Sequence, residues 1–167
     1  MAFARAASRR IRSQILGALL LCVAAVASLG VAVSADAASA AELSAARTEA
    51  HKLLLMTNDV REHHDLRPLR DRRRLSRYAT RHTVRMVRRG SLFHSTSSRM
   101  SDALSGTGWS MWGENVGVGS TLRRVQRAFM HSTEHRENIL RRAFDHAGIG
   151  VVRSDGYVWV TVDFYAC

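Results

Sequence analysis

The sequence predicts an α+β sandwich in which the helices come first and an antiparallel sheet forms late in the chain. Apolar residues recur at helical spacing over residues 43–64 and again from Leu75 to Met86. Near the C-terminus, the segments AGIGVV and YVWVTVDFYA are joined by SDG, which is typical of two strands connected by a hairpin turn. The chain has no internal repeat, so this order favours one layered domain.

The N-terminus has the pattern of a secretory signal peptide. A basic segment, RRIRSQ, precedes an almost wholly apolar run that begins at Ile15. Small residues at Ala38 and Ala40 fit the −3 and −1 positions of a cleavage site. We therefore expect residues 1–40 to be removed after Ala40 and the remainder to be exported. The apolar run is also long enough to span a bilayer, so an uncleaved anchor is the alternative.

Residues 41–167 suit a single domain. They contain twenty Arg and one Lys against thirteen Asp and Glu, so their net charge is 21 − 13 = +8. This charge favours anionic partners such as acidic lipid or envelope polymers. Only Cys167 remains after the expected cleavage, which excludes an intramolecular disulfide. Export without disulfides is typical of a bacterial secreted domain.

The first half of this domain is predicted to be helical. The first helix covers residues 43–64, and Pro68 ends the linker that follows. The second helix has one apolar stripe from Leu75 to Met86, which includes His82, and stops at Gly90. We expect His82 to be a hydrogen-bonded core residue, because it lies on an apolar face.

The second half alternates irregular segments with short elements. Residues 95–111 are rich in Ser, Thr and Gly, with one helical turn expected near residues 100–104. The segment GENVGVG, residues 113–119, is expected to form a short strand between turns. A third helix is lined by Leu122, Val125 and Phe129. The last strand alternates apolar and polar residues, as a half-buried strand does.

The arginine-rich segment from residue 67 to residue 90 resembles a nucleic-acid patch, but helical geometry favours another interpretation. On a helix, five arginines fall within one narrow arc away from the apolar stripe: Arg74, Arg77, Arg81, Arg85 and Arg88. The aromatic platforms of single-strand binders are missing apart from Tyr78. We therefore predict a solvated face, weak adhesion to an anionic envelope component, and no specific nucleic-acid partner.

Three side chains stand where a regular element gives way to a loop. His94 follows the second helix, Glu114 lies among glycines at a strand edge, and His135 follows the third helix. A carboxylate beside glycines packs poorly but suits a functional site. Two imidazoles and one carboxylate can bind zinc or another divalent metal with one position open. The alternative is a metal-free polar network in which Glu114 accepts hydrogen bonds from both histidines.

Six motifs occur in an order and spacing that resemble the CAP superfamily, also called the SCP domain: NDVR, RPL, LFHSTS, GENVGVG, FMHSTEHRENIL and FDHAGIGVV. The likeness is strongest to the cysteine-poor bacterial secreted branch and covers residues 50–165. This resemblance implies a three-layer α-β-α sandwich with a mainly antiparallel sheet. It also implies a cleft that holds His94, Glu114 and His135, with a divalent metal in some members.

The chain departs from the family pattern at several positions. Ser132 takes the place of a second glutamate that many members carry on the third helix, and Phe129 replaces the usual tryptophan. The missing acid weakens the case for catalysis by four residues. Within the implied cleft we expect Ser95, Asn115 and Ser132 to line the surface.

The segment HSTEH also matches H-x-x-E-H, the signature of one class of zinc peptidases. That chemistry needs both histidines on one face of an unbroken helix. The family alignment ends the helix near Ser132, so His131 would point away from His135. We interpret the match as accidental and Glu134 as a loop residue without a role.

The resemblance favours a secreted binding module for a lipid, a sterol or an envelope polysaccharide, with peripheral membrane contact at most if the signal is cleaved. Trp109, Met111 and Trp112 are candidates to line its groove, with core packing as the alternative. The second candidate function is metal-assisted hydrolysis by His94, Glu114 and His135. The sequence identifies no activated nucleophile, so it leaves open whether the chain is an enzyme.

Overall fold

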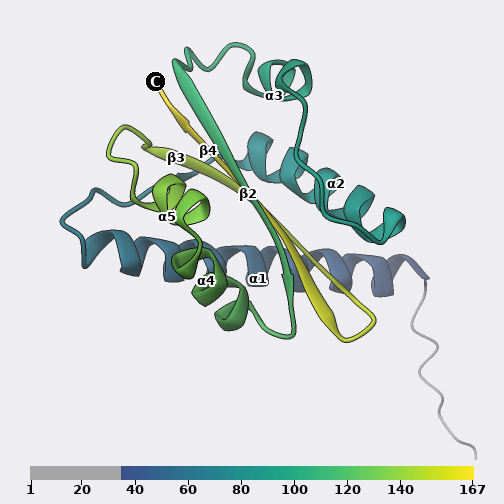
Figure 1. Ribbon diagram of the computed structural model, residues 1–167. Helices are drawn as coiled ribbons and strands as arrows, with labels where there is room; N and C mark the ends of the chain where they lie inside the picture. Colours follow the sequence, from purple (N-terminus) through teal and green to yellow (C-terminus); the bar gives the residue numbers. More distant parts are fainter. Residues whose placement is uncertain (1–34) are drawn as a thin grey trace, which may run out of the picture. The chain divides into compact units, whose positions relative to one another are not determined.

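The computed structural model describes residues 35–167 (Figure 1). The apolar run of the predicted signal peptide lies outside the described residues, and the predicted cleavage position at Ala40 lies within the first helix, which begins at Ala35. No helix within residues 35–167 has both the length and the hydropathy needed to cross a membrane.

The two helices predicted for the first half are present, but the short strand between them was not predicted, and residues 97–104 form a helix where one turn was expected. Helix α1 covers Ala35–Glu62, the two-residue strand β1 covers Arg70–Asp71, helix α2 covers Arg73–Arg89, and helix α3 covers Ser97–Leu104. Helix α2 ends at Gly90, as expected, because Gly90 adopts a left-handed conformation and closes the last turn. The exposed arginines of α2 confirm its solvated face, although Arg85 is half-buried.

The second half contains one helix more than the sequence predicts. Strand β2 covers Met111–Gly119, helix α4 covers Leu122–His131, helix α5 covers Thr133–Leu140, strand β3 covers His146–Ser154, and strand β4 covers Tyr157–Ala166. The break between α4 and α5 at Ser132 confirms that His131 and His135 do not share an unbroken helix. The prediction of a loop at Glu134 is wrong, since Glu134 lies in the first turn of α5.

The sheet has four strands in the order β1-β3-β4-β2 and is mainly antiparallel, as expected. Only the short pair β1–β3 is parallel. Strands β3 and β4 form the predicted hairpin, and its turn residues Asp155 and Gly156 have φ angles of 50° and 77°. Positive φ at both positions matches the turn that suits the twist of a two-residue hairpin.

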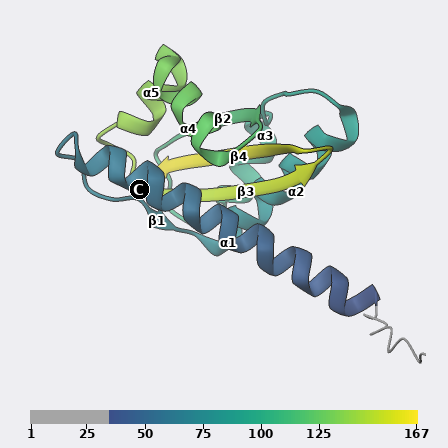
Figure 2. The ribbon, with the colours of Figure 1, turned by 90° about the horizontal axis from the view of Figure 1, so that it is seen from below.

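Helices cover both faces of this sheet and complete the three layers (Figures 1 and 2). Helices α1, α4 and α5 pack on one face, where Leu53, Val125, Phe129, Val160 and Phe164 belong to the larger core. Helices α2 and α3 pack on the opposite face, where a smaller core gathers Leu75, Tyr78, Met100, Leu104 and Tyr165. The α+β sandwich is therefore confirmed.

Two glycines of β3 allow α2 to lie unusually close to the sheet. A Cβ atom at Gly148 would come within 2.5 Å of the backbone of Leu75, and one at Gly150 within 2.4 Å of the backbone of Ala79. Any side chain at these positions would force the helix away from the strand. The AGIGVV motif therefore sets the spacing between α2 and β3.

The last strand differs from its predicted half-buried pattern. Thr161 and Asp163 are fully buried, although they alternate with the apolar residues. Strand β4 lies between β3 and β2, and helices cover both of its faces. Alternation along a strand identifies its two faces but does not say whether the second face is solvated.

Candidate functional site

A buried carboxylate holds an exposed imidazole at the edge strand β2. Glu114 Oε1 lies 2.8 Å from His94 Nδ1, and the same oxygen accepts a hydrogen bond of 2.8 Å from the backbone N–H of Ser95. The side chain of His94 is 62% exposed, whereas that of Glu114 is 1% exposed. Because an ionised carboxylate only accepts, Nδ1 carries a hydrogen, and in the neutral form of the ring the lone pair then lies on Nε2.

A second histidine supports this pair from inside the protein. His82 is buried, and its Nε2 donates to the carbonyl of Phe93 at 2.8 Å, while Arg85 donates to its Nδ1 at 3.0 Å. Its Nε2 also lies 3.9 Å from Glu114 Oε2. The expectation of a hydrogen-bonded core histidine is confirmed. Through Phe93, His82 fixes the loop that presents His94.

Ser95 belongs to the same hydrogen-bond network and does not form part of the exposed surface. Its hydroxyl accepts a hydrogen bond of 2.8 Å from Tyr78 and lies 3.3 Å from His82 Nδ1. Burial raises the pKa of Tyr78, and its hydrogen bond to Ser95 acts in the opposite direction. Because Ser95 is buried, it positions the loop and contributes little surface to a cleft.

A second carboxyl group lies directly behind Glu114, and the sequence did not identify it as part of the site. Asp163 is the cross-strand partner of Glu114 and is fully buried. Within the described residues, neither oxygen of Asp163 nor Glu114 Oε2 has a hydrogen-bond partner. Burial first, and the charge of Glu114 second, raise the pKa of Asp163 well above its usual value. Asp163 therefore favours its neutral form, in which its O–H can donate to Glu114.

The remaining predicted site residue, His135, lies on the opposite side of β2. It stands in the first turn of α5, where its Nδ1 lies 2.8 Å from the hydroxyl of Ser132 and its ring packs 5.0 Å from that of Phe129. Burial, and next the charge of His94, lower the pKa of His135. His135 therefore favours its neutral form.

The predicted cleft residue Asn115 has a structural position. It is fully buried, its side-chain amide donates to the carbonyl of His135 at 2.9 Å, and its oxygen accepts from Asn138 at 2.8 Å. These bonds fasten α5 to β2 and so place His135. Asn115 is therefore buried and cannot line the predicted cleft. Of the expected lining residues, Ser132 is the one whose side chain contacts His135.

The donor set at this site fits a metal only in part. Within residues 35–167, the one group of three or more potential ligands with all ligand atoms within 4.8 Å of one another is Asp145, His146 and Cys167, and the predicted set does not meet this distance. Glu114 Oε1 is already engaged by His94 and by a backbone N–H. A carboxylate in this position orients a metal-binding histidine from behind. Glu114 therefore fits the role of a support that orients His94, and not that of a third ligand.

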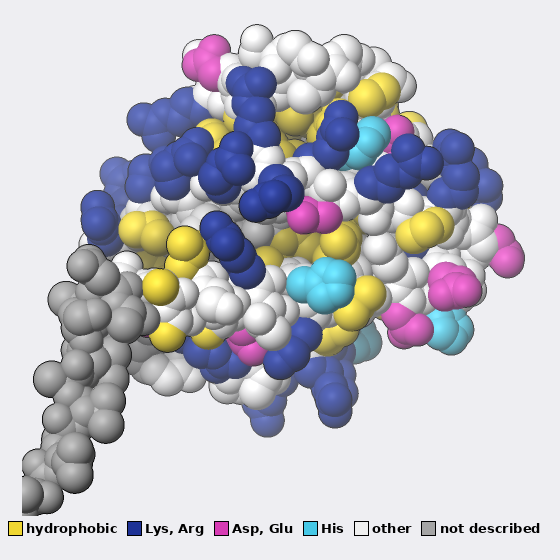
Figure 3. Space-filling view, turned by 180° about the vertical axis from the view of Figure 1, so that it is seen from behind, with side chains coloured by type: hydrophobic (Ala, Val, Ile, Leu, Met, Phe, Trp, Pro, Cys, Tyr) yellow, Lys and Arg dark blue, Asp and Glu magenta, His cyan; other side chains and the backbone are white. Residues whose placement is uncertain are grey.

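A separate groove lies between α1 and α2. It has a volume of about 410 Å³. Its apolar lining is Leu43, Ala46, Ala50, Leu54 and Ile149, and four arginines stand around it: Arg47, Arg73, Arg77 and Arg81. On the back of the molecule, hydrophobic side chains lie exposed among Lys and Arg side chains (Figure 3).

The sequence placed a groove elsewhere. Trp109 and Trp112, which we expected as candidates for its lining, pack half-buried against the smaller core, and Met111 is partly exposed. The arginine arc and the first apolar helix were both recognised in the sequence. Only the tertiary structure brings them together as the two walls of one groove.

A family model for the cysteine-rich secretory protein family, CAP, matches residues 54–164. A curated relative, the uncharacterized protein YkwD of Bacillus subtilis, is 33% identical over 113 residues, which is 65% of this chain and 44% of the relative. The chain thus spans less than half the length of that relative.

Two solved structures have a similar fold. An extracellular protein of Bacillus anthracis that contains a SCP domain matches with a TM-score of 0.64 and 21% identity, over 73% of this chain and 41% of that one. An outer surface protein of Borrelia burgdorferi matches with a TM-score of 0.64 and 18% identity, over 71% of this chain and 92% of that one.

Proposed function

Since this chain belongs to the CAP family of cysteine-rich secretory proteins, we propose that it is an exported protein that binds an anionic lipid in the groove between α1 and α2. Export is supported by the signal-peptide pattern of residues 1–40 and by structural neighbours described as extracellular and outer-surface proteins. The observation that carries the proposal is the combination of an aliphatic groove with an arginine rim.

Each half of the groove matches one half of an amphiphile. The aliphatic side chains of Leu43, Leu54 and Ile149 can remove an acyl chain from water, which stabilises binding by about 0.8 kcal/mol for each buried CH₂ group. The guanidinium groups of Arg77 and Arg81 can pair with a phosphate or carboxylate headgroup through charge-assisted hydrogen bonds. A volume of about 410 Å³ lies in the usual range of small-ligand sites.

The other two ligand classes fit this groove less well. A sterol has no charge to pair with four arginines, and a neutral polysaccharide also lacks such a charge and finds no Trp, Tyr or Phe ring to stack on, although the lining includes the polar residues His51, Asp71, Ser76 and Thr80. The net charge of +8 over residues 41–167, obtained as 21 − 13, also favours an anionic partner. An anionic lipid is therefore the ligand class we propose.

The experiment is a lipid-binding titration with a matched pair of variants. Arg77→Gln and Arg88→Gln remove the same charge from exposed positions of α2, but only Arg77 lines the groove. Loss of a charge-assisted hydrogen bond costs about 1.5–3 kcal/mol, so Arg77→Gln should weaken binding of a fatty acid or phosphatidylglycerol about tenfold or more. Arg88→Gln should leave the affinity nearly unchanged. Ala50→Trp, which fills the groove, should block binding.

Two results would contradict the proposal. Equal weakening by Arg77→Gln and Arg88→Gln would mean that net charge, and not the groove, attracts the lipid. Binding of an uncharged sterol with the same affinity, or retention of binding by Ala50→Trp, would place the ligand class or the site elsewhere.

A hydrolase that acts through His94 and Glu114 is the second candidate, and one observation favours it. Glu114 orients His94 from a buried position, so Nε2 is free to accept a proton or to bind a metal at an exposed surface. Divalent metal would supply Lewis-acid polarisation of a substrate carbonyl or of water there. The chain itself orients His94 and holds His135 neutral.

This candidate is tested by hydrolysis of a peptide and ester library with and without zinc. His94→Gln, which keeps a polar side chain, should abolish turnover, whereas His131→Gln, at an exposed position at the end of α4, should not. Activity that is equal in both variants would exclude His94 from the reaction.

A further inference from the structure

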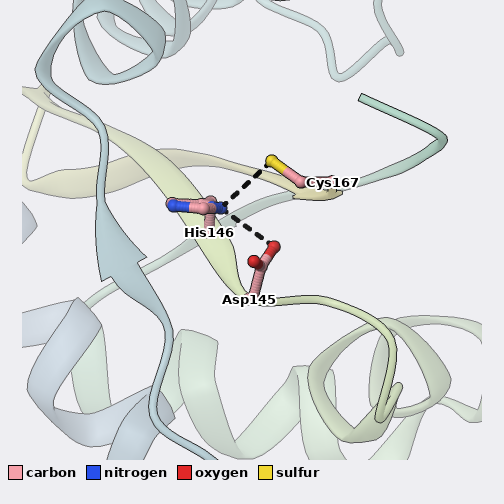
Figure 4. A group of neighbouring side chains, drawn as sticks. All are labelled: Asp145, His146 and Cys167. Carbon is pink, nitrogen blue, oxygen red and sulfur yellow. Dashed lines mark hydrogen bonds and ion pairs between the residues drawn. The ribbon is translucent and has the colours of Figure 1, made fainter. Parts of the chain in front are cut away.

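A second group of chemically reactive side chains lies at the opposite end of β3 from the hairpin. Asp145 precedes β3, His146 is its first residue, and Cys167 follows the end of β4. Because β3 and β4 are antiparallel, with His146 opposite Tyr165, the beginning of one strand lies beside the end of the other. The three side chains therefore converge although more than twenty positions separate Cys167 from His146 (Figure 4).

The distances are close to those of a metal site. Asp145 Oδ1 lies 2.9 Å and Cys167 Sγ lies 4.0 Å from His146 Nδ1, and all three ligand atoms lie within 4.8 Å of one another. Around tetrahedral zinc, with bonds of about 2.0 Å to nitrogen and oxygen and about 2.3 Å to sulfur, the ligand atoms are roughly 3.3–3.8 Å apart. Shifts of less than about 1 Å would bring this group to that geometry.

The same distances exclude a catalytic relay. In a relay, the carboxylate and the nucleophile contact opposite nitrogens of the imidazole, so that a proton passes across the ring. Here Asp145 and Cys167 both face Nδ1. If one ion binds all three side chains through Nδ1 of His146, then Asp145 and Cys167 must both lie near that nitrogen, as they do here. We propose that Asp145, His146 and Cys167 bind zinc or another thiophilic divalent metal, at a site separate from His94 and Glu114.

The surroundings of the imidazole support this assignment. His146 is buried and stacks on Tyr165, with ring centroids 4.7 Å apart and planes inclined by 12°, so its orientation is fixed. Cys167 is exposed, which gives an ion access from solvent and leaves a fourth position for water. A thiolate and a carboxylate together neutralise the two charges of the ion, and the combination of sulfur, nitrogen and oxygen ligands suits zinc.

Arg72 competes with the metal. Its Nε donates to the hydroxyl of Tyr165 at 2.7 Å, and the ring of Tyr165 stacks on His146. The guanidinium therefore lies one side chain away from the imidazole of the proposed site. Binding of a dication places two like charges near each other, so removal of the Arg72 charge should tighten the site.

The experiment is a cobalt titration of the full-length chain that carries Cys22→Ala, so that Cys167 is its only thiol. Cobalt bound to a thiolate absorbs in the near ultraviolet. We expect a band that saturates at one equivalent and disappears when zinc displaces the cobalt. Cys167→Ser should abolish the band. Asp145→Asn, and His146→Phe, which keeps the ring stacked on Tyr165, should each weaken binding about tenfold or more.

Two further variants sharpen the test. Arg72→Gln should tighten cobalt binding severalfold, a result that a merely adventitious thiol would not give. His94→Ala should leave the band unchanged, which separates this site from the candidate site at His94 and Glu114. The absence of a saturable band, or a band of the same affinity in Asp145→Asn and His146→Phe, would overturn the proposal. Because Cys167 is exposed, an unchanged thermal transition of metal-free Cys167→Ser will show that its fold is intact.

Discussion

Arg61 offers the most direct test of how this fold is held together. Although it lies in the last turn of α1, it is fully buried, and its guanidinium donates four hydrogen bonds to backbone carbonyls. The acceptors are Arg67 at 2.9 Å, Ile139 at 2.8 Å, Arg141 at 3.1 Å and Phe144 at 2.9 Å. This one side chain therefore links the end of α1 to the end of α5 and to the segment that leads into β3.

The contribution of Arg61 to the free energy of unfolding follows from these hydrogen bonds. A hydrogen bond from a charged donor contributes about 1.5–3 kcal/mol, so four give roughly 6–12 kcal/mol as an upper bound. Burial, and next the charge of Arg67, lower the pKa of Arg61, which means that desolvation offsets part of this gain. Arg61→Met leaves the four carbonyls without that donor, and we expect a loss of about 3–5 kcal/mol, as for a broken buried charge network.

Urea unfolding followed by circular dichroism measures this loss. Arg61→Lys keeps the charge but not the planar fork, so its loss should be smaller than that of Arg61→Met yet still above about 1 kcal/mol. Arg67→Gln is the control, because the Arg67 side chain is exposed and only its backbone carbonyl takes part. A loss below about 1 kcal/mol in Arg61→Met would refute the reasoning.

Three further predictions concern buried groups around the sheet. The pKa of Asp163 is raised in the folded state, so the folded chain holds a proton that the unfolded chain releases, and stability falls as the pH rises above the ordinary pKa of a carboxyl group. Asp163→Asn should therefore raise the melting temperature near pH 7, and this gain should fade toward about pH 4. Gly150→Ala should lower stability by about 1–3 kcal/mol in thermal unfolding, because the new Cβ would lie 2.4 Å from the Ala79 backbone; an unchanged transition would contradict the close approach of α2. The NMR titration midpoint of His135 should lie below 6.5 and rise in a His94→Ala variant. An unchanged midpoint in that variant would rule out coupling between the two rings.

Much of the fold follows from short-range patterns. The stripe of α2, its stop at Gly90 and the Asp155–Gly156 hairpin were each predicted from residues within one or two turns of one another, whereas the break at Ser132 was implied by the family resemblance. Periodicity and turn chemistry act over such distances, so these elements do not depend on what packs against them. Helix α5 was missed because its eight residues lack an apolar stripe, and bonds from Asn115 and Arg61 to its backbone carbonyls hold it.

The candidate site was predicted in part. The sequence, through its family motifs, identified His94, Glu114 and His135, and the structure pairs the first two directly. It did not show that Glu114 faces inward toward Asp163, because that depends on which strand lies beside β2. Cross-strand neighbours are set by the order of the sheet, and no local pattern encodes that order.

By itself, the sequence determined the longer elements, their order and the family, because local periodicity and motifs encode them, but it missed β1 and α5. Only the tertiary structure decided which polar groups lost contact with water and which distant residues met. The burial of Asp163, the groove between α1 and α2, and the meeting of His146 with Cys167 all arise when helices cover both faces of one sheet. Burial and proximity are properties of that packing, because each depends on residues far away in the chain.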